Sequence, residues 1–70
     1  MITDVAKVGI AVRTARKTLG LTQDTLAAAS GVGPRFIVEL EAGKPTVQMD
    51  KVFAVLAVLE ITLQLEPPPR

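Results

Sequence analysis

Residues 19–44 read LGLTQDTLAAASGVGPRFIVELEAGK, and this stretch decides the fold. Thr22 is a favourable N-cap for a short, alanine-rich helix over residues 23–30, and Gly31 suits the left-handed position that ends such a helix. Pro34 suits the first position of the next helix, where a missing N–H costs nothing. Two helices joined by a short turn that contains glycine predict a helix-turn-helix unit.

The flanking segments predict one further helix on each side of this unit. Apolar residues step by three and four along residues 4–19 and form one stripe, consisting of Val5, Val8, Val12, Ala15 and Leu19. Beyond the unit, Thr46 is expected to cap a fourth helix that runs to about Leu59. The sequence therefore predicts an all-α domain of four helices.

The period changes after the fourth predicted helix, because residues 61–66 read ITLQLE and alternate between apolar and polar. That alternation predicts a β-strand, which the prolines of residues 67–70 end. A lone strand is unstable, so we expect it to pair antiparallel with the same strand of a second copy. Two alternatives remain, a frayed tail or a continuation of the fourth helix. The expected organisation is a domain over residues 1–60, a dimerising strand over 61–66 and a tail over 67–70, with the dimer contacts made by Ile61, Leu63 and Leu65.

Composition excludes several classes of chemistry. The chain has 70 residues, of which 49% are apolar, and it contains neither histidine nor cysteine. Disulfides, thiolate zinc sites, cysteine nucleophiles and Ser-His-Asp triads are thereby excluded. We therefore expect no enzyme, no metal and no cofactor. A domain this small without a covalent staple needs tight helix packing, a partner chain or both.

Charge and hydropathy favour a cytoplasmic protein as the default. The formal net charge is +1, which neither demands nor excludes a nucleic-acid partner. The longest uncharged apolar run covers residues 52–59, much shorter than the roughly 20 residues that a transmembrane helix needs. The first residues lack the continuous apolar stretch of a signal peptide, so no membrane partner is expected.

Three motifs occur together: LGLTQ at residues 19–23, a glycine in the turn, and LEAGK at residues 40–44. With them, residues 8–59 resemble the phage-repressor-like helix-turn-helix regulators, also called the XRE or Cro/C1 type. The final strand is similar to that of the HipB-like antitoxin branch of this family. The resemblance implies a prokaryotic, nucleoid-associated homodimer that binds a palindromic operator in double-stranded DNA, represses its own operon and binds a HipA-like kinase toxin. Two alternatives are an interaction module that restrains a toxin with weak DNA reading, and a stand-alone regulator.

The first residues of each helix in the unit carry the expected DNA contacts. Gln23 lies at a helix N-terminus, which favours a phosphate, and the resemblance implies that it clamps the DNA backbone. Arg35 lies near the start of the recognition helix, where an arginine bonds guanine O6 and N7. Glu39, one turn later, either accepts from a cytosine amino group or pairs with Arg35 on the surface.

The chain departs from its relatives at Gly33 and Pro34, where those proteins carry polar side chains. These residues are placed at the DNA face, but they remove donors from the start of the recognition helix. The base-reading chemistry of the family therefore does not transfer directly. Val38, where relatives often have serine, either contacts a thymine methyl group or packs near the preceding helix.

Basic residues outside the recognition helix are candidate phosphate contacts. Lys44 is the strongest, because in this family the loop after the recognition helix lies against the DNA backbone. Arg13 is a weaker candidate, as is Lys17, and for both the alternative is a solvated surface charge. The resemblance implies a structural ion pair between Arg16 and Glu41 that joins the first helix to the third.

Overall fold

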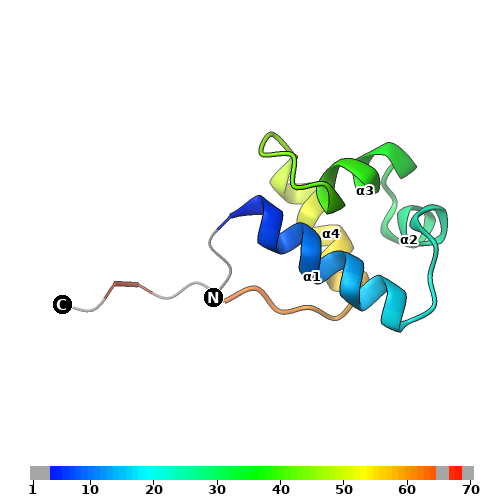
Figure 1. The fold of residues 1–70 in the computed structure, drawn as a ribbon, viewed down its shortest axis with the longest axis horizontal. Coiled ribbons are helices and arrows are strands. Elements are labelled where there is room, and N and C mark those ends of the chain that lie inside the picture. The colour runs from blue at the N-terminus through cyan, green and yellow to red at the C-terminus, as the bar shows by residue number, and fades with distance from the viewer. Residues whose placement is uncertain (1–3, 65–66, 69–70) are drawn as a thin grey trace.

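The computed structural model describes residues 4–64 and 67–68, and this part of the chain contains four α-helices (Figure 1). They are α1 (Val5–Thr18), α2 (Gln23–Ser30), α3 (Pro34–Glu41) and α4 (Met49–Val58). The predicted all-α, four-helix architecture is confirmed. None of the helices within these residues is long and apolar enough to cross a membrane.

Local capping explains where α1 and α2 begin. The Asp4 side chain accepts a hydrogen bond from the backbone N–H of Lys7 at 2.9 Å, which satisfies one of the free donors at the start of α1. Thr22 does the same for α2 by accepting from the backbone N–H of Thr25 at 3.0 Å. Thr22 is the N-cap expected from the sequence.

The turn between α2 and α3 is built on glycine. Gly31 ends α2 in the left-handed conformation, with φ of 72°, which a residue with a side chain adopts only with strain. Gly33 then serves as the N-cap of α3, and Pro34 takes the first helical position as expected. The short turn sets the angle between α2 and α3, the two helices of the predicted helix-turn-helix unit.

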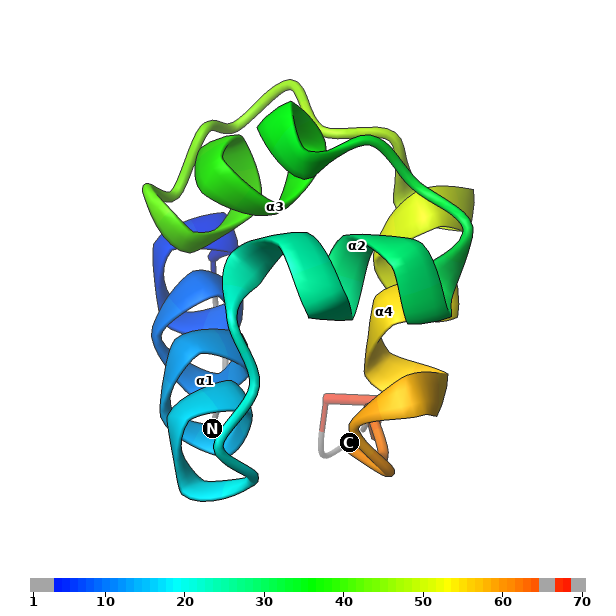
Figure 2. The same ribbon diagram turned by 90° about the vertical axis from the view of Figure 1, so that its right-hand side faces the viewer.

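The helices enclose one apolar core. α1 and α4 flank α2, and α3 lies across the top of this arrangement in Figure 2. The buried apolar side chains come from all four helices and the end of α4: Val12, Leu26, Ala27, Ile37, Leu40, Val52, Val55, Leu56 and Leu59. Burial of these side chains holds the exposed face of α3 in a fixed orientation.

Glycine also lets α1 approach α3 closely. A Cβ atom built on Gly9 would overlap the carbonyl oxygen of Leu40 and lie 3.0 Å from the carbonyl oxygen of Glu41. No larger residue fits there unless the two helices move apart. Gly9 therefore fixes the distance between α1 and the C-terminal end of α3.

The expected start of the fourth helix is wrong. Its N-cap is Gln48 rather than Thr46, and no side-chain hydrogen bond caps it. Val47 packs against the core instead of opening the helix. Thr46 and Val47 are β-branched, a class that loses side-chain freedom in a helix, so the chain stays irregular for one more turn.

The C-terminal segment does not form the expected β-strand in the single chain. No strand occurs among the residues that the structure describes, and residues 61–64 are irregular. A strand needs a backbone partner, and pairing with a second copy is outside what one chain contains. Ile61 and Leu63 are partly buried and pack against the core of their own chain. Leu65, the third expected dimer contact, lies outside the described residues.

Candidate nucleic-acid interface

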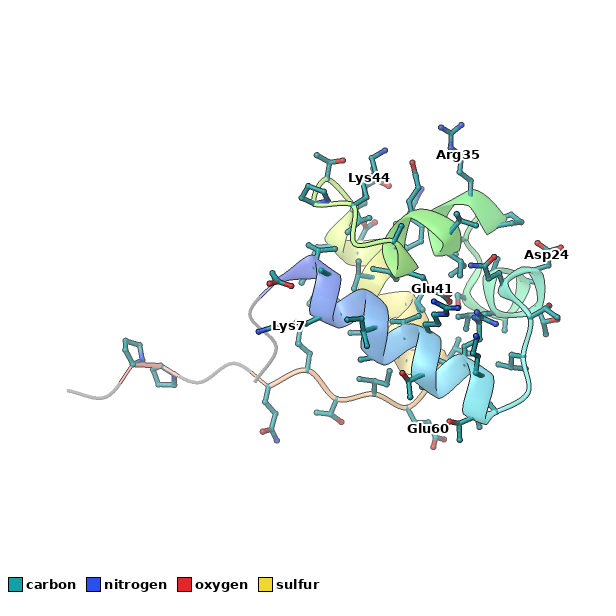
Figure 3. The ribbon with its side chains drawn as sticks, viewed as in Figure 1. Lys7, Asp24, Arg35, Glu41, Lys44 and Glu60 are labelled. Atoms are coloured by element: carbon teal, nitrogen blue, oxygen red, sulfur yellow. The ribbon has the colours of Figure 1, made fainter. Side chains whose placement is uncertain are left out.

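The outer face of α3 is open to solvent. The Arg35 side chain is 90% exposed and extends from the first turn of the helix, at the top of the molecule in Figure 3. Val38, one turn further on, is 49% exposed and is not part of the core. This exposure disfavours the interpretation of Val38 as a packing residue and leaves an apolar side chain on the face expected to read DNA.

The start of α3 offers little hydrogen-bonding capacity. Gly33 has no side chain and makes no side-chain cap, and Pro34 has no backbone N–H. Both residues are exposed, so ligand groups can approach the backbone here. Specific polar contacts from this helix must therefore come from residues beyond the first position, beginning with Arg35.

Arg16 and Glu41 form the interhelical ion pair that the resemblance implies. Their side chains are 10% and 5% exposed, and Arg16 donates to both carboxylate oxygens of Glu41, at 2.7 and 3.0 Å. Arg16 also donates to the carbonyl oxygen of Leu21 at 2.8 Å. The hydrogen bond to Glu41 raises the pKa of Arg16, and burial opposes that shift. The pair joins α1, α3 and the loop before α2.

Gln23 is held by the same buried pair. It is the first residue of α2, and its side-chain amide donates to Glu41 at 3.3 Å. This bond orients the side chain while leaving the amide oxygen and the second N–H available. The arrangement positions Gln23 at a helix N-terminus, where partial positive charge favours an anion.

A second, exposed cluster surrounds Glu39. Lys44 donates to Oε2 of Glu39 at 2.8 Å, and Arg35 lies 3.7 Å from the same oxygen. The hydrogen bond from Lys44 is the main cause that holds the pKa of Glu39 below its ordinary value, and the nearby charges of Lys44 and Arg35 add to it. The surface pair between Glu39 and Arg35 is thus present in the single chain.

Cations lie on both flanks of α3. On one side, Arg13 and Lys17 from α1 line a shallow hollow together with Gln23 and Val38. Arg13 and Lys17 are exposed. They lie beside the outer face of α3.

On the other flank, a second hollow is lined by residues of α3, α4 and the loop between them, including Arg35, Glu39, Lys44 and Lys51. The Nζ atom of Lys51 lies 5.9 Å from the centre of the Phe36 ring. Sequence reasoning missed Lys51 as a candidate contact. Lys51 is far from α3 in the sequence, and only the packing of α4 against the helix-turn-helix unit brings it to this hollow. The sequence alone therefore did not indicate it.

Comparisons with known proteins identify the family to which the chain belongs. A helix-turn-helix family profile matches residues 12–65, and the chain belongs to this family of DNA-binding transcriptional regulators. A relative from Sinorhizobium fredii (strain NBRC 101917 / NGR234), described as an uncharacterized HTH-type transcriptional regulator y4mF, is 51% identical over 63 residues. The aligned region covers 90% of this chain and 83% of that relative. Neither the family nor this relative is described as an enzyme.

Solved structures of HipB share the fold. The chain superposes on HipB in the structure titled HipA-HipB-O2-O3 complex with a TM-score of 0.86, at 23% sequence identity, over 99% of this chain and 97% of that one. The structure titled HipB-O4 20mer complex gives the same TM-score, identity and coverage. At this level of identity the likeness establishes a common fold.

Proposed function

We propose that this protein is a sequence-specific repressor that acts as a homodimer on a palindromic operator of its own operon, and that it is the antitoxin of a HipB-like toxin–antitoxin pair. The DNA-binding part of this proposal is supported by the exposed face of α3. Arg35 lies at the start of this face, and basic side chains lie on both sides of it. This exposed face supports the proposal, because the second helix of a helix-turn-helix unit presents its outer side to the major groove.

Each candidate residue has a distinct role in this proposal. Arg35 reads a guanine, and Val38 contacts a thymine methyl group. Gln23, Lys44 and Arg13 bind phosphates and set the register of the protein on the duplex. Gly33 and Pro34 let the DNA approach the start of α3 closely.

The test compares two substitutions on the DNA upstream of the gene and on a random duplex of equal length. We expect Arg35→Ala to lower the preference for the operator by about 1–3 kcal/mol and to relax specificity at one base pair. Lys44→Ala should weaken binding to both duplexes about equally and reduce the slope of log K against log salt by about one. Equal binding of the unmodified protein to both duplexes at matched salt would contradict the proposal.

The homodimer is proposed to form through residues 61–66, paired antiparallel about a two-fold axis. In this arrangement the two recognition helices enter successive major grooves, about 34–36 Å apart for half-sites one helical turn apart. Ile61 and Leu63 already contact the core of their own chain, so the strand would extend the core to the partner copy.

A truncation separates dimerisation from folding. Deleting residues 64–70 keeps Ile61 and Leu63 but removes half of the proposed strand, so we expect a folded monomer without cooperative operator binding. Sedimentation equilibrium measures the mass, and circular dichroism serves as the control for folding. A truncated chain that remains dimeric at the same concentration would exclude the strand pairing.

The antitoxin role draws support from the fold shared with HipB, which occurs together with HipA in the structure titled HipA-HipB-O2-O3 complex. We propose a HipA-like kinase as the partner of this chain. Co-expression with the neighbouring genes, followed by purification through a tag on this chain, tests this role. Recovery of a kinase-like partner supports it, and absence of any such gene or partner favours a stand-alone regulator.

A second function is favoured by one observation, the lack of side-chain donors at Gly33 and Pro34. A module that restrains a toxin with weak DNA reading would need no donors there. Measured operator preference distinguishes the two proposals. A repressor would prefer its operator, whereas the interaction module would bind a partner protein tightly and all duplexes alike.

A further inference from the structure

The exposed basic side chains nearest to the proposed DNA-binding face of α3 already form ion pairs in the single chain. Lys44 and Arg35 both lie against Oε2 of Glu39, at 2.8 and 3.7 Å. The three side chains are 49%, 90% and 28% exposed, so water and a ligand can reach all of them. One carboxylate oxygen therefore takes the place that a phosphate oxygen would take on these two cations.

We propose that Glu39 is an internal anion that holds Lys44 and Arg35 until duplex DNA displaces it, and that it thereby lowers the affinity for duplex DNA of any sequence. This inference rests on the proposed DNA-binding function and assigns Glu39 a role in setting the affinity for DNA. Non-specific duplex offers phosphate in exchange for the carboxylate, and the released carboxylate is then repelled by the DNA. An operator must displace the same carboxylate, so the cost of breaking the cluster is common to specific and non-specific binding.

The same hollow contains a cation that provides an internal comparison. Lys51 lies over the Phe36 ring, and no ion pair joins it to Glu39 in the described part of the chain. If Glu39 restrains only the cations that it contacts, removing its charge should change what Lys44 contributes to DNA binding more than what Lys51 contributes.

The experiment measures dissociation constants of the full-length protein for the upstream DNA and for a random duplex, each at several salt concentrations. We expect Glu39→Gln to tighten binding to the random duplex about threefold to tenfold and to steepen its salt dependence. Binding to the operator should tighten by a similar factor, because the same cluster is broken in both complexes. Glu60→Gln is the matched control: it makes the same change in net charge at an exposed residue on the opposite side of the molecule (Figure 3).

A double-mutant cycle sharpens the test. Lys44→Ala should reduce affinity for the random duplex by a larger factor in the Glu39→Gln background than in the unmodified protein. Lys51→Ala should reduce it by a similar factor in both backgrounds. These paired results would support the proposal because they locate the effect at the observed contact.

Three outcomes would overturn it. An equal gain from Glu60→Gln would assign the effect to net charge alone. A loss of operator affinity with unchanged random-duplex affinity would make Glu39 a direct reader of a base. If the unmodified protein bound neither duplex, the proposed DNA-binding function itself would fail, an outcome distinguishable from the other two.

Discussion

Glu39 and Glu41 are two residues apart on α3, yet they make ion pairs of opposite character. Glu41 points into the molecule, where its side chain is 5% exposed and binds Arg16 and Gln23. Glu39 lies on the outer side, where its partners remain open to solvent. The buried pair stays together because either charge left alone in the interior would lack solvent. The exposed cluster can exchange its partners with a ligand. The same residue type thus stabilises the fold at one position and tunes a surface at the other.

The largest effect is expected from breaking the buried pair. Glu41→Ala leaves the Arg16 guanidinium buried with only the carbonyl oxygen of Leu21 as a partner. We expect a loss of about 3–5 kcal/mol in the free energy of unfolding, measured by urea denaturation. The fold of this small domain is then marginal.

Replacing both partners at once tests the origin of that loss. The double variant Arg16→Met with Glu41→Leu removes both charges together, so it should be more stable than Glu41→Ala alone. If both variants lost the same stability, the contribution would come from attraction within the pair and not from an unpaired buried charge.

A smaller effect is expected from separating the two helices that carry the buried pair. Gly9→Ala places a Cβ atom against the carbonyl oxygens of Leu40 and Glu41, so α1 and α3 must move apart. We expect a loss of about 1–3 kcal/mol in the free energy of unfolding, although alanine is the better helix former by up to about 1 kcal/mol.

Gly33→Ala is the matched control for that substitution, because a Cβ atom there meets nothing within 4 Å. Its φ of −73° also suits alanine, and the preference for glycine over alanine at an N-cap is opposed by the smaller conformational entropy that alanine gives the unfolded chain. If Gly9→Ala matched this control in thermal denaturation, the close approach of α1 and α3 would not limit stability.

The helices that carry the buried ion pair could largely be predicted from the sequence. The apolar period of residues 4–19, Thr22 and Pro34 predicted three helices, because caps and periodicity are local properties. The family motif placed Arg16 opposite Glu41, while the residues alone did not. Thr46 misled because its capping chemistry is local, whereas the burial of Val47 is a tertiary effect.

The exposed half was harder to predict. The pair between Arg35 and Glu39 follows from helical spacing, since residues four apart share a face. Lys44 lies beyond the end of α3, so its contact with Glu39 depends on the path of the loop. The position of Lys51 depends on how α4 packs. Likewise, the alternation in residues 61–66 does not specify whether Ile61 and Leu63 contact their own core or a second chain.

The smallest expected effect is the acid dependence of the exposed cluster. The hydrogen bond from Lys44 lowers the pKa of Glu39 in the folded protein below its value in the unfolded chain. The unfolded chain therefore binds the proton more readily, and the cluster contributes stability above the ordinary glutamate pKa. That contribution is lost as the pH falls through the lowered pKa of the folded state.

The difference in unfolding free energy between the unmodified protein and Glu39→Gln isolates this contribution, because the other carboxylates are common to both proteins. We expect the difference to favour the unmodified protein at neutral pH and to shrink as the pH falls through the ordinary glutamate pKa to the lowered pKa of the folded state. In a Lys44→Ala background the pKa of Glu39 returns towards its ordinary value, so the same difference should be smaller at neutral pH and vary less with acid. A difference that grew on acidification would mean that protonated Glu39 stabilises the fold, and the exposed cluster would then not be the exchangeable ion pair that distinguishes Glu39 from Glu41.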